Sequence, residues 1–231
     1  MFCFKEIPKN KGAYGGGLYL YGGRDPTNSS RSRIGRSSDG ISWQTVTIFS
    51  TTAIYALTYG NGIYVAGGTG GRIATSANAV TWTNQTSGTT SVIYALIYNE
   101  DDNIFVYGGA GGVLATSTNG TTWSTKTSNT TASILSLAYS NGIYVYGDGD
   151  GNVGTSTDLN NWKNYLQTST TYDINAIASD GQKFVFVTTG DGGEDSYVGI
   201  GNISGNTKFT LPNKMIDLVT DVFTQKIYIK K

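Results

Sequence analysis

The sequence predicts an all-β fold in which a four-stranded antiparallel unit is repeated along 231 residues. Its only tryptophans, Trp43, Trp82, Trp123 and Trp162, recur at intervals of 39, 41 and 39 residues. A fixed period near 40 residues indicates a structural unit copied along the chain. Each tryptophan also closes a similar phrase, such as Ser37-Ser-Asp-Gly-Ile-Ser-Trp43. With 32 Gly, 16 Tyr and only 3 Pro, the composition suits strands and turns.

Each unit contains four short segments with the character of strands. In the second unit these are 53–59, 63–68, 72–76 and the strand that begins at Trp82. The segments are rich in β-branched and aromatic residues and are bounded by Gly, Asn or Asp, which indicates strands joined by hairpins. No segment has a helical period with caps. The first two strands of later units are expected at 92–98 and 104–109, at 133–139 and 143–147, and at 173–179 and 183–187.

The turn before each tryptophan strand has its own signal. Asp39-Gly40 and Asn119-Gly120 fit a tight turn that needs a positive φ. Ala79 and Leu159 stand where those glycines are, so we expect the second and fourth turns to differ in geometry.

Repeated four-stranded units of about 40 residues are how β-propellers are built. We predict a single domain over residues 1–231, with units at about 8–49, 50–88, 89–129, 130–169 and 170–212 and a half unit at 213–231. In the fifth unit Phe209 takes the place of tryptophan. In the half unit, 215–221 and 226–229 match the first two strands, and the N-terminal segment 2–7 would complete the sheet. The prediction is therefore six blades with terminal-strand closure, and five blades is the alternative.

The phrase Ser-x-Asp/Asn-Gly-x-Thr/Ser-Trp, clearest at 37–43 and 117–123, resembles the Asp-box (BNR) repeat of sialidase-like β-propellers. The resemblance covers roughly residues 12–211 and implies the propeller fold without fixing an activity. In such boxes the Ser and Asp side chains bond amides of their own turn, and the tryptophan fills the gap between blades. We interpret the four tryptophans as structural markers of the repeat. The run Tyr-Gly-Asn-Gly-Ile-Tyr-Val-Ala-Gly-Gly at 59–68 also resembles propellers of bacteriophage tail and fibre proteins.

Charge and cysteine content exclude several classes of partner. Lys and Arg number 16 and Asp and Glu number 16, so no net field attracts nucleic acid or acidic membranes. The lone cysteine, Cys3, cannot form an internal disulfide. The first ten residues lack the apolar core of a signal peptide, and no apolar run is long enough to cross a bilayer. We therefore expect neither nucleic-acid binding nor membrane insertion.

The residue inventory argues against an enzyme. A sialidase needs three converging arginines, but all five arginines lie in the first two units: Arg24, Arg31, Arg33, Arg36 and Arg72. The absence of histidine removes Ser-His-Asp chemistry and His-ligated metals. Carboxylate pairs remain at Asp148 with Asp150 and at Glu194 with Asp191 or Asp195, but each lies within one loop, where hairpin solvation explains it.

Three groups of residues are candidate binding sites. The inserted segment 24–31 and its surroundings carry Arg24, Arg31 and Arg33, which could contact an acidic partner. Tyr59, Tyr98 and Tyr139 recur at the end of the first strand and could stack on neutral sugars. Asp148, Asp150 and Asn152 alternate like the ligands of a calcium loop, although no bidentate acid follows. We interpret this loop as a turn with two exposed acids and expect no cofactor, with calcium as the alternative.

These observations favour a non-enzymatic binding and assembly module. The expected setting is a phage virion or tail, where the protein would contact a host surface glycan or another structural subunit, and homo-oligomers are compatible with it. The alternatives are a sialidase-like glycoside hydrolase or polysaccharide lyase, and a free-standing extracellular lectin.

Overall fold

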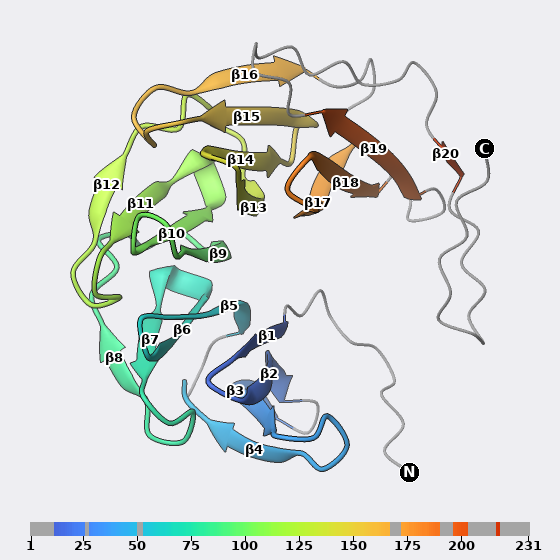
Figure 1. Ribbon diagram of the computed structural model, residues 1–231. Helices are drawn as coiled ribbons and strands as arrows, with labels where there is room; N and C mark the ends of the chain where they lie inside the picture. The colour runs from blue at the N-terminus through green and yellow to red at the C-terminus, as the bar shows by residue number, and fades with distance from the viewer. Residues whose placement is uncertain are drawn as a thin grey trace. The chain divides into compact units, whose positions relative to one another are not determined.

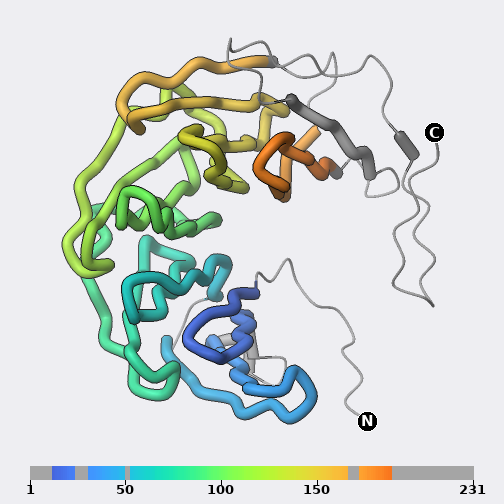
Figure 2. The backbone as a smooth tube through the Cα atoms, viewed as in Figure 1, coloured from blue at the N-terminus to red at the C-terminus, as the bar shows by residue number. Residues whose placement is uncertain are grey.

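The computed structural model describes residues 12–25, 28–49, 53–166, 172–189, 196–202 and 216–217. These residues form five four-stranded antiparallel sheets (Figure 1), which confirms the predicted repeat. The backbone completes the strands of one sheet before it enters the next (Figure 2). The chain divides into two compact units, residues 1–126 with three sheets and residues 127–231 with two.

The first unit holds the first three sheets. The first sheet contains β1 (Gly12–Gly15), β2 (Leu18–Asp25), β3 (Asn28–Ser37) and β4 (Gln44–Thr47). The second contains β5 (Ile54–Gly60), β6 (Ile63–Gly68), β7 (Ile73–Ser76) and β8 (Thr83–Gln85), and the third contains β9 (Ile93–Asn99), β10 (Ile104–Gly109), β11 (Leu114–Ser117) and β12 (Ser124–Lys126). Short 3₁₀ turns, η1 (Thr69–Gly71) and η2 (Ala110–Gly112), join the middle strands of the second and third sheets.

The second unit holds the last two sheets. The fourth sheet contains β13 (Ile134–Ser140), β14 (Ile143–Asp148), β15 (Asn152–Ser156) and β16 (Lys163–Leu166). The fifth contains β17 (Asp173–Ser179), β18 (Lys183–Thr189), β19 (Ser196–Asn202) and β20 (Ile216–Asp217).

The outer strand of the fifth sheet differs from the expectation. We expected residues 215–221 to begin the last half unit, but Ile216 pairs with Val198 and Asp217 with Tyr197, so β20 belongs to the fifth sheet. This pairing satisfies backbone groups on the free edge of β19. Phe209 and the segments 2–7 and 226–229 lie outside the described residues, so closure by the terminal strands stays a prediction.

Alternation along the strands gives every sheet two different faces. The second residue of each sheet's second strand is aromatic in all five sheets, and we call the face that carries it the tyrosine face. The third residue of the same strand lies on the opposite face, which we call the valine face. The aromatic positions are Tyr19, Tyr64, Phe105, Tyr144 and Phe184, and the positions that follow are Leu20, Val65, Val106, Val145 and Val185.

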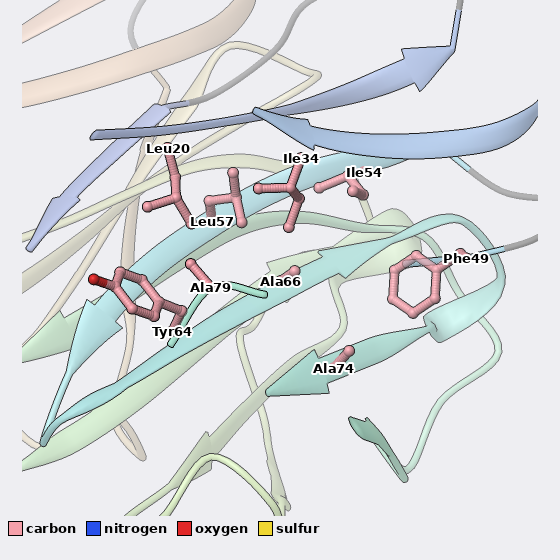
Figure 3. Packing of buried hydrophobic residues seen from close by; sticks show 9 residues of the cluster. All are labelled: Leu20, Ile34, Phe49, Ile54, Leu57, Tyr64, Ala66, Ala74 and Ala79. Carbon is pink, nitrogen blue, oxygen red and sulfur yellow. The ribbon is translucent and has the colours of Figure 1, made fainter. Parts of the chain in front are cut away.

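The core lies between consecutive sheets of each unit, where a valine face meets the next tyrosine face. Leu20 and Ile34 from the valine face of the first sheet pack with Tyr64, Ala66 and other residues of the second sheet (Figure 3). A similar cluster joins the second and third sheets, and another joins the fourth and fifth. Burial of these apolar side chains is what stacks the sheets.

The turns before the tryptophan strands correct one expectation. Gly40 and Gly120 both have φ 71°, and Ala79 and Leu159 adopt the same left-handed conformation at φ 56° and 62°. The second and fourth turns therefore keep the geometry of the other two. The side chains of Ala79 and Leu159 are buried, so apolar burial offsets the strain of the left-handed backbone.

Candidate functional site

The tyrosine face of the first sheet is exposed, although its counterparts are buried. Tyr19 is 44% exposed, whereas the equivalent Tyr64, Phe105, Tyr144 and Phe184 are 2%, 0%, 1% and 0% exposed. Large exposed apolar and aromatic side chains are unusual on a monomer and mark contact surfaces when they cluster. We call this surface the open tyrosine face.

Aromatic contacts organise the open tyrosine face into two pairs. The rings of Tyr14 and Tyr19 have centroids 4.5 Å apart, and those of Tyr21 and Trp43 are 5.0 Å apart. Tyr14, Tyr19 and Trp43 are exposed by 65%, 44% and 40%. Because strand partners share a face, Tyr14, Tyr19 and Tyr21 project to the same side of the sheet.

Two of the predicted arginines lie on the same face. Arg33 pairs with Gly23, two residues beyond Tyr21, so it shares that face, and Arg31 follows by alternation along β3. Arg31 is exposed and Arg33 is partly buried. The inserted segment 24–31, which carries Arg31, lengthens the hairpin of β2 and β3. The side chain of Arg24 lies outside the described residues.

The remaining arginine of the first sheet has a different role. Arg36 pairs with Leu20 on the valine face, where its Nη2 donates to Gln44 Oε1 at 2.5 Å. Its Nε is buried and has no hydrogen-bond partner among the described residues. The structure therefore separates Arg36 from the arginines of the open tyrosine face.

The predicted sugar-stacking tyrosines lie between sheets. Tyr59 and Tyr98 are partly buried, and a Cβ on Gly15 or Gly60 of the preceding sheet would collide with their rings. Tyr64 Oη also donates to the carbonyl of Gly15 at 2.8 Å. Close approach to a glycine backbone is a packing role.

Tyr139 belongs to the fourth sheet, where its ring centroid lies 4.6 Å from that of Tyr144. Tyr59 and Tyr98 form equivalent pairs with Tyr64 and Phe105, also at 4.6 Å. The three tyrosines thus repeat one arrangement, each in its own sheet, and sugar stacking by them stays a prediction.

The predicted calcium loop is a hydrogen-bonded turn. Asp148 Oδ1 accepts from the backbone amides of Asp150 and Asn152 at 3.0 and 2.8 Å. Its Oδ2 accepts from Thr130 Oγ1 and Asn152 Nδ2 at 2.9 and 3.0 Å. Asp150 is exposed as expected, but Asp148 is fully buried, so the expectation of two exposed acids is wrong for Asp148. The carboxylate replaces a glycine-rich 3₁₀ turn and satisfies the loop's own amides.

The acidic residues of the described ranges do not gather into a larger cluster. No group of three or more His, Cys, Asp or Glu side chains there could hold a metal ion. Calcium binding by Asp148, Asp150 and Asn152 stays a prediction, and the second acidic group, 191–195, lies outside the described residues. No helix in the described part of the chain is long and apolar enough to span a membrane.

The tryptophan turns have the internal bonding expected of scaffold. Ser37 Oγ accepts from the amide of Gly40 at 2.8 Å, and Asp39 Oδ1 accepts from the amides of Ile41 and Ser42, both at 2.8 Å. These amides, Ser42 first, lower the pKa of Asp39 to about 2. Trp43 Nε1 donates to the carbonyl of Gly40 at 3.1 Å.

The other tryptophans differ in their surroundings. Trp123 and Trp162 donate to the carbonyls of Gly120 and Leu159 at 3.1 and 3.3 Å. Trp82 Nε1 is buried and has no hydrogen-bond partner in the part of the chain that the structure describes. Exposure falls from 40% for Trp43 to 5% for Trp162, with the other two partly buried.

No protein-family model and no curated protein sequence matches the chain. Solved structures do resemble it. Virginiamycin B lyase from Staphylococcus aureus superposes with a TM-score of 0.70 at 15% identity, over 88% of this chain and 67% of that one. The WD40 β-propeller domain of Doa1 gives 0.65 at 10% identity, over 89% and 67%. The computationally designed Ika8 protein gives 0.61 at 19% identity, over 83% of this chain and 57% of its own length.

These likenesses, together with the five four-stranded sheets, show that the chain has a β-propeller fold. At such low identity they show the fold alone. The fold is consistent with a binding or assembly module. The open tyrosine face was not predicted as a site, because Tyr14 and Tyr19 follow the same pattern as the buried tyrosines.

Proposed function

We propose that this chain is a non-enzymatic binding and assembly module of a phage virion or tail, which contacts a host surface glycan or another structural subunit. The observation that carries the proposal is the open tyrosine face, where Tyr14, Tyr19 and Trp43 are exposed, whereas their equivalents in the other sheets are buried or partly buried. Exposed aromatic rings supply large contact area at low conformational cost.

The chemistry of the open tyrosine face suits either kind of partner. Tyrosine and tryptophan faces stack on sugar rings, and their hydroxyl and indole groups add hydrogen bonds. Thr45 and Thr47 of β4 pair with Gly35 and Arg33 and so lie on this face as exposed hydroxyls. Arg31 and Arg33 add cationic groups that can pair with carboxylate or phosphate.

The phage setting is supported by the resemblance of the repeats to Asp-box turns and to propellers of tail and fibre proteins. A glycoside hydrolase or polysaccharide lyase is the competing function, and one structural neighbour is named a lyase. The two readings differ in whether a polysaccharide is shortened or only bound.

The test uses purified protein on a glycan array, on host cells and in a sedimentation assay with tail or virion particles. Tyr19→Ala and Trp43→Ala should each weaken binding at least tenfold. Val80→Ala, an exposed position in the turn between β7 and β8, should leave binding unchanged. Wild-type binding unaffected by both aromatic changes would refute the role of the face. Shortening of a polysaccharide by the wild-type protein would refute the non-enzymatic assignment.

A further inference from the structure

The chain contains three Asn-Gly pairs, and two of them lie in hairpins of the same kind. Asn61-Gly62 joins β5 to β6, and Asn141-Gly142 joins β13 to β14. The backbone is left-handed at both residues of each pair, with φ 46° and 77° in the first and 52° and 78° in the second. Two-residue hairpin turns of this kind favour Asn-Gly. The third pair, Asn119-Gly120, lies in the tryptophan turn between β11 and β12.

The two hairpin pairs are open to solvent, and their asparagine side chains are not held. All four residues are exposed. A Cβ built on Gly62 or Gly142 would meet nothing within 4 Å. Among the described residues, the side chains of Asn61 and Asn141 have no hydrogen-bond partner. Water can therefore reach both pairs, and the asparagine side chains can rotate without breaking a hydrogen bond.

The third pair is held by packing and by hydrogen bonds. Gly120 is buried, and a Cβ there would lie 2.8 Å from a side-chain atom of β6. Its amide donates to Ser117 Oγ at 2.8 Å. Asn119 Oδ1 accepts from the amides of Thr121 and Thr122 at 3.0 and 2.9 Å. Rotation of the Asn119 side chain towards the nitrogen of Gly120 would break these bonds and leave their donors unpaired.

We infer that Asn61 and Asn141 are sites of spontaneous deamidation and that the fold protects Asn119. The amide nitrogen of the following glycine attacks Cγ of the asparagine, so the N–Cγ bond forms and the Cγ–Nδ2 bond breaks. Ammonia leaves with the proton of the glycine amide, and the product is a cyclic imide. Water then adds to either carbonyl of the imide and opens it to aspartate or isoaspartate. Glycine favours the first step because it has no Cβ to hinder the approach of its nitrogen.

The modification would change the charge of two hairpins. Each deamidation replaces a neutral amide with a carboxylate, so one event at each of the two sites takes the formal net charge from 0 to −2. The corresponding hairpin of the third sheet, between β9 and β10, already carries Asp101 and Asp102. Deamidation thus gives the hairpins of the second and fourth sheets the acidic character that the third has from its sequence. The inference does not depend on the proposed function.

Peptide mapping after digestion with trypsin follows the three sites separately. Cleavage after lysine and arginine places one Asn-Gly pair in each of the peptides 37–72, 73–126 and 127–163. The folded full chain is incubated in mildly alkaline buffer, and fragment spectra locate the conversion of amide to acid. Aspartate and isoaspartate forms should accumulate at Asn61 and Asn141 at least tenfold faster than at Asn119.

The chain unfolded in guanidinium chloride is the matched control, because all three pairs then lack tertiary contacts and should react at similar rates. In the folded chain, Ser117→Ala removes the acceptor of the Gly120 amide and should accelerate the reaction at Asn119 at least threefold, with Asn61 and Asn141 unchanged. Circular dichroism verifies that this variant folds, and the comparison of folded and unfolded wild type decides the inference if it does not.

Equal rates at the three sites of the folded chain would overturn the inference. It would also fail if Asn61 and Asn141 reacted as slowly as Asn119 in the folded chain while all three reacted quickly in the unfolded one. An unchanged rate at Asn119 in folded Ser117→Ala would overturn the protection assigned to the tryptophan turn.

Discussion

Gly67→Ala tests the packing of a valine face on the next tyrosine face. A Cβ at Gly67 would lie 2.8 Å from Ile93 Cγ2 and 3.1 Å from Leu96 Cδ1. Carbon atoms in ordinary contact are about 3.5–4.0 Å apart, so the new methyl requires shifts of at least about 0.7 Å. Ile93 and Leu96 are both buried and cannot move into solvent.

The magnitude follows from two opposing terms. Overpacking of a core costs about 1–3 kcal/mol. Replacement of glycine at an ordinary extended backbone recovers about 0.4–1 kcal/mol through the unfolded state. We expect Gly67→Ala to lower the free energy of unfolding by about 1–2 kcal/mol.

A double-mutant cycle identifies the atom responsible. Ile93→Leu removes the β-branch that carries Cγ2 at nearly constant volume and should itself cost less than about 1.5 kcal/mol. In that background the destabilisation by Gly67→Ala should be smaller by about 1 kcal/mol. It should not vanish, because Leu96 Cδ1, at 3.1 Å, still crowds the new methyl. Urea unfolding followed by circular dichroism and tryptophan fluorescence measures all four proteins, with coincident transitions as the two-state check.

Gly149→Ala is the control for this cycle, because its nearest neighbour would be 3.5 Å away, and its effect should stay within about 0.5 kcal/mol. Additive effects of Gly67→Ala and Ile93→Leu would refute the reasoning, since they would mean that the two side chains do not share the space.

Three further predictions concern the turns and a buried phenol. In urea unfolding, Ala79→Gly should change the free energy of unfolding by less than about 0.5 kcal/mol, and Leu159→Gly should lower it by about 2 kcal/mol. Both changes relieve the strain of a left-handed backbone, but only Leu159→Gly removes a large buried side chain. Asp39→Asn should fold normally at pH 7, and its stability should depend less on acid pH than that of the wild type. The pKa of Asp39 is lowered to about 2, so the ionised carboxylate stabilises the fold above pH 3.8. This stabilisation is lost as the pH falls to about 2. Burial raises the pKa of Tyr107 to about 12. The contribution of the neutral phenol to the stability of the fold is therefore complete below pH 10 and is lost as the pH rises towards 12. In a spectrophotometric titration, Tyr107→Phe should lack the phenolate that forms last in the wild type.

The strand pattern could be predicted closely because it depends on local sequence. The second strand of the second sheet, 63–68, was predicted with the bounds of β6. Alternating aromatic and β-branched residues that follow a Gly-Asn-Gly turn favour a strand and also fix where it begins. The turn at Ala79 was mispredicted, because residue preference favours glycine there and burial of the methyl is a tertiary effect.

The candidate site could not be predicted from the repeat. Tyr19 and Tyr64 occupy equivalent positions, yet Tyr19 is 44% exposed, whereas Tyr64 is 2% exposed and donates to the carbonyl of Gly15 in the neighbouring sheet. Asp148 illustrates a second limit: its alternation with Asp150 suggested an exposed loop, but Thr130, 18 residues earlier, supplies a partner that buries it. Both failures concern contacts between distant residues, which a local pattern does not contain.

One buried site of the repeat is filled by an aromatic ring even where the residue at the usual position is small, and the second sheet is the example. In the first and fourth sheets a tyrosine ring covers a facing glycine, at Tyr21 with Gly35 and Tyr146 with Gly154, and packs on the tryptophan. The second sheet has Ala66 at the tyrosine position.

The space over Ala66 is filled from another part of the chain. Phe49, 2% exposed, packs in the cluster of Ala66 and Ala74 (Figure 3), and its amide donates to Ser32 Oγ at 3.1 Å. A ring from the connecting segment thus does what a strand tyrosine does elsewhere. If so, removing the ring and restoring the tyrosine should compensate one another.

Phe49→Ala alone should cost about 3–5 kcal/mol, because it leaves a cavity in the cluster. Ala66→Tyr alone should cost about 1–3 kcal/mol, because the space is occupied. The double variant should be more stable than Phe49→Ala by at least about 1 kcal/mol, and the new ring should quench or shift the fluorescence of Trp82. Summed costs in the double variant would mean that Phe49 does not occupy the missing tyrosine's place.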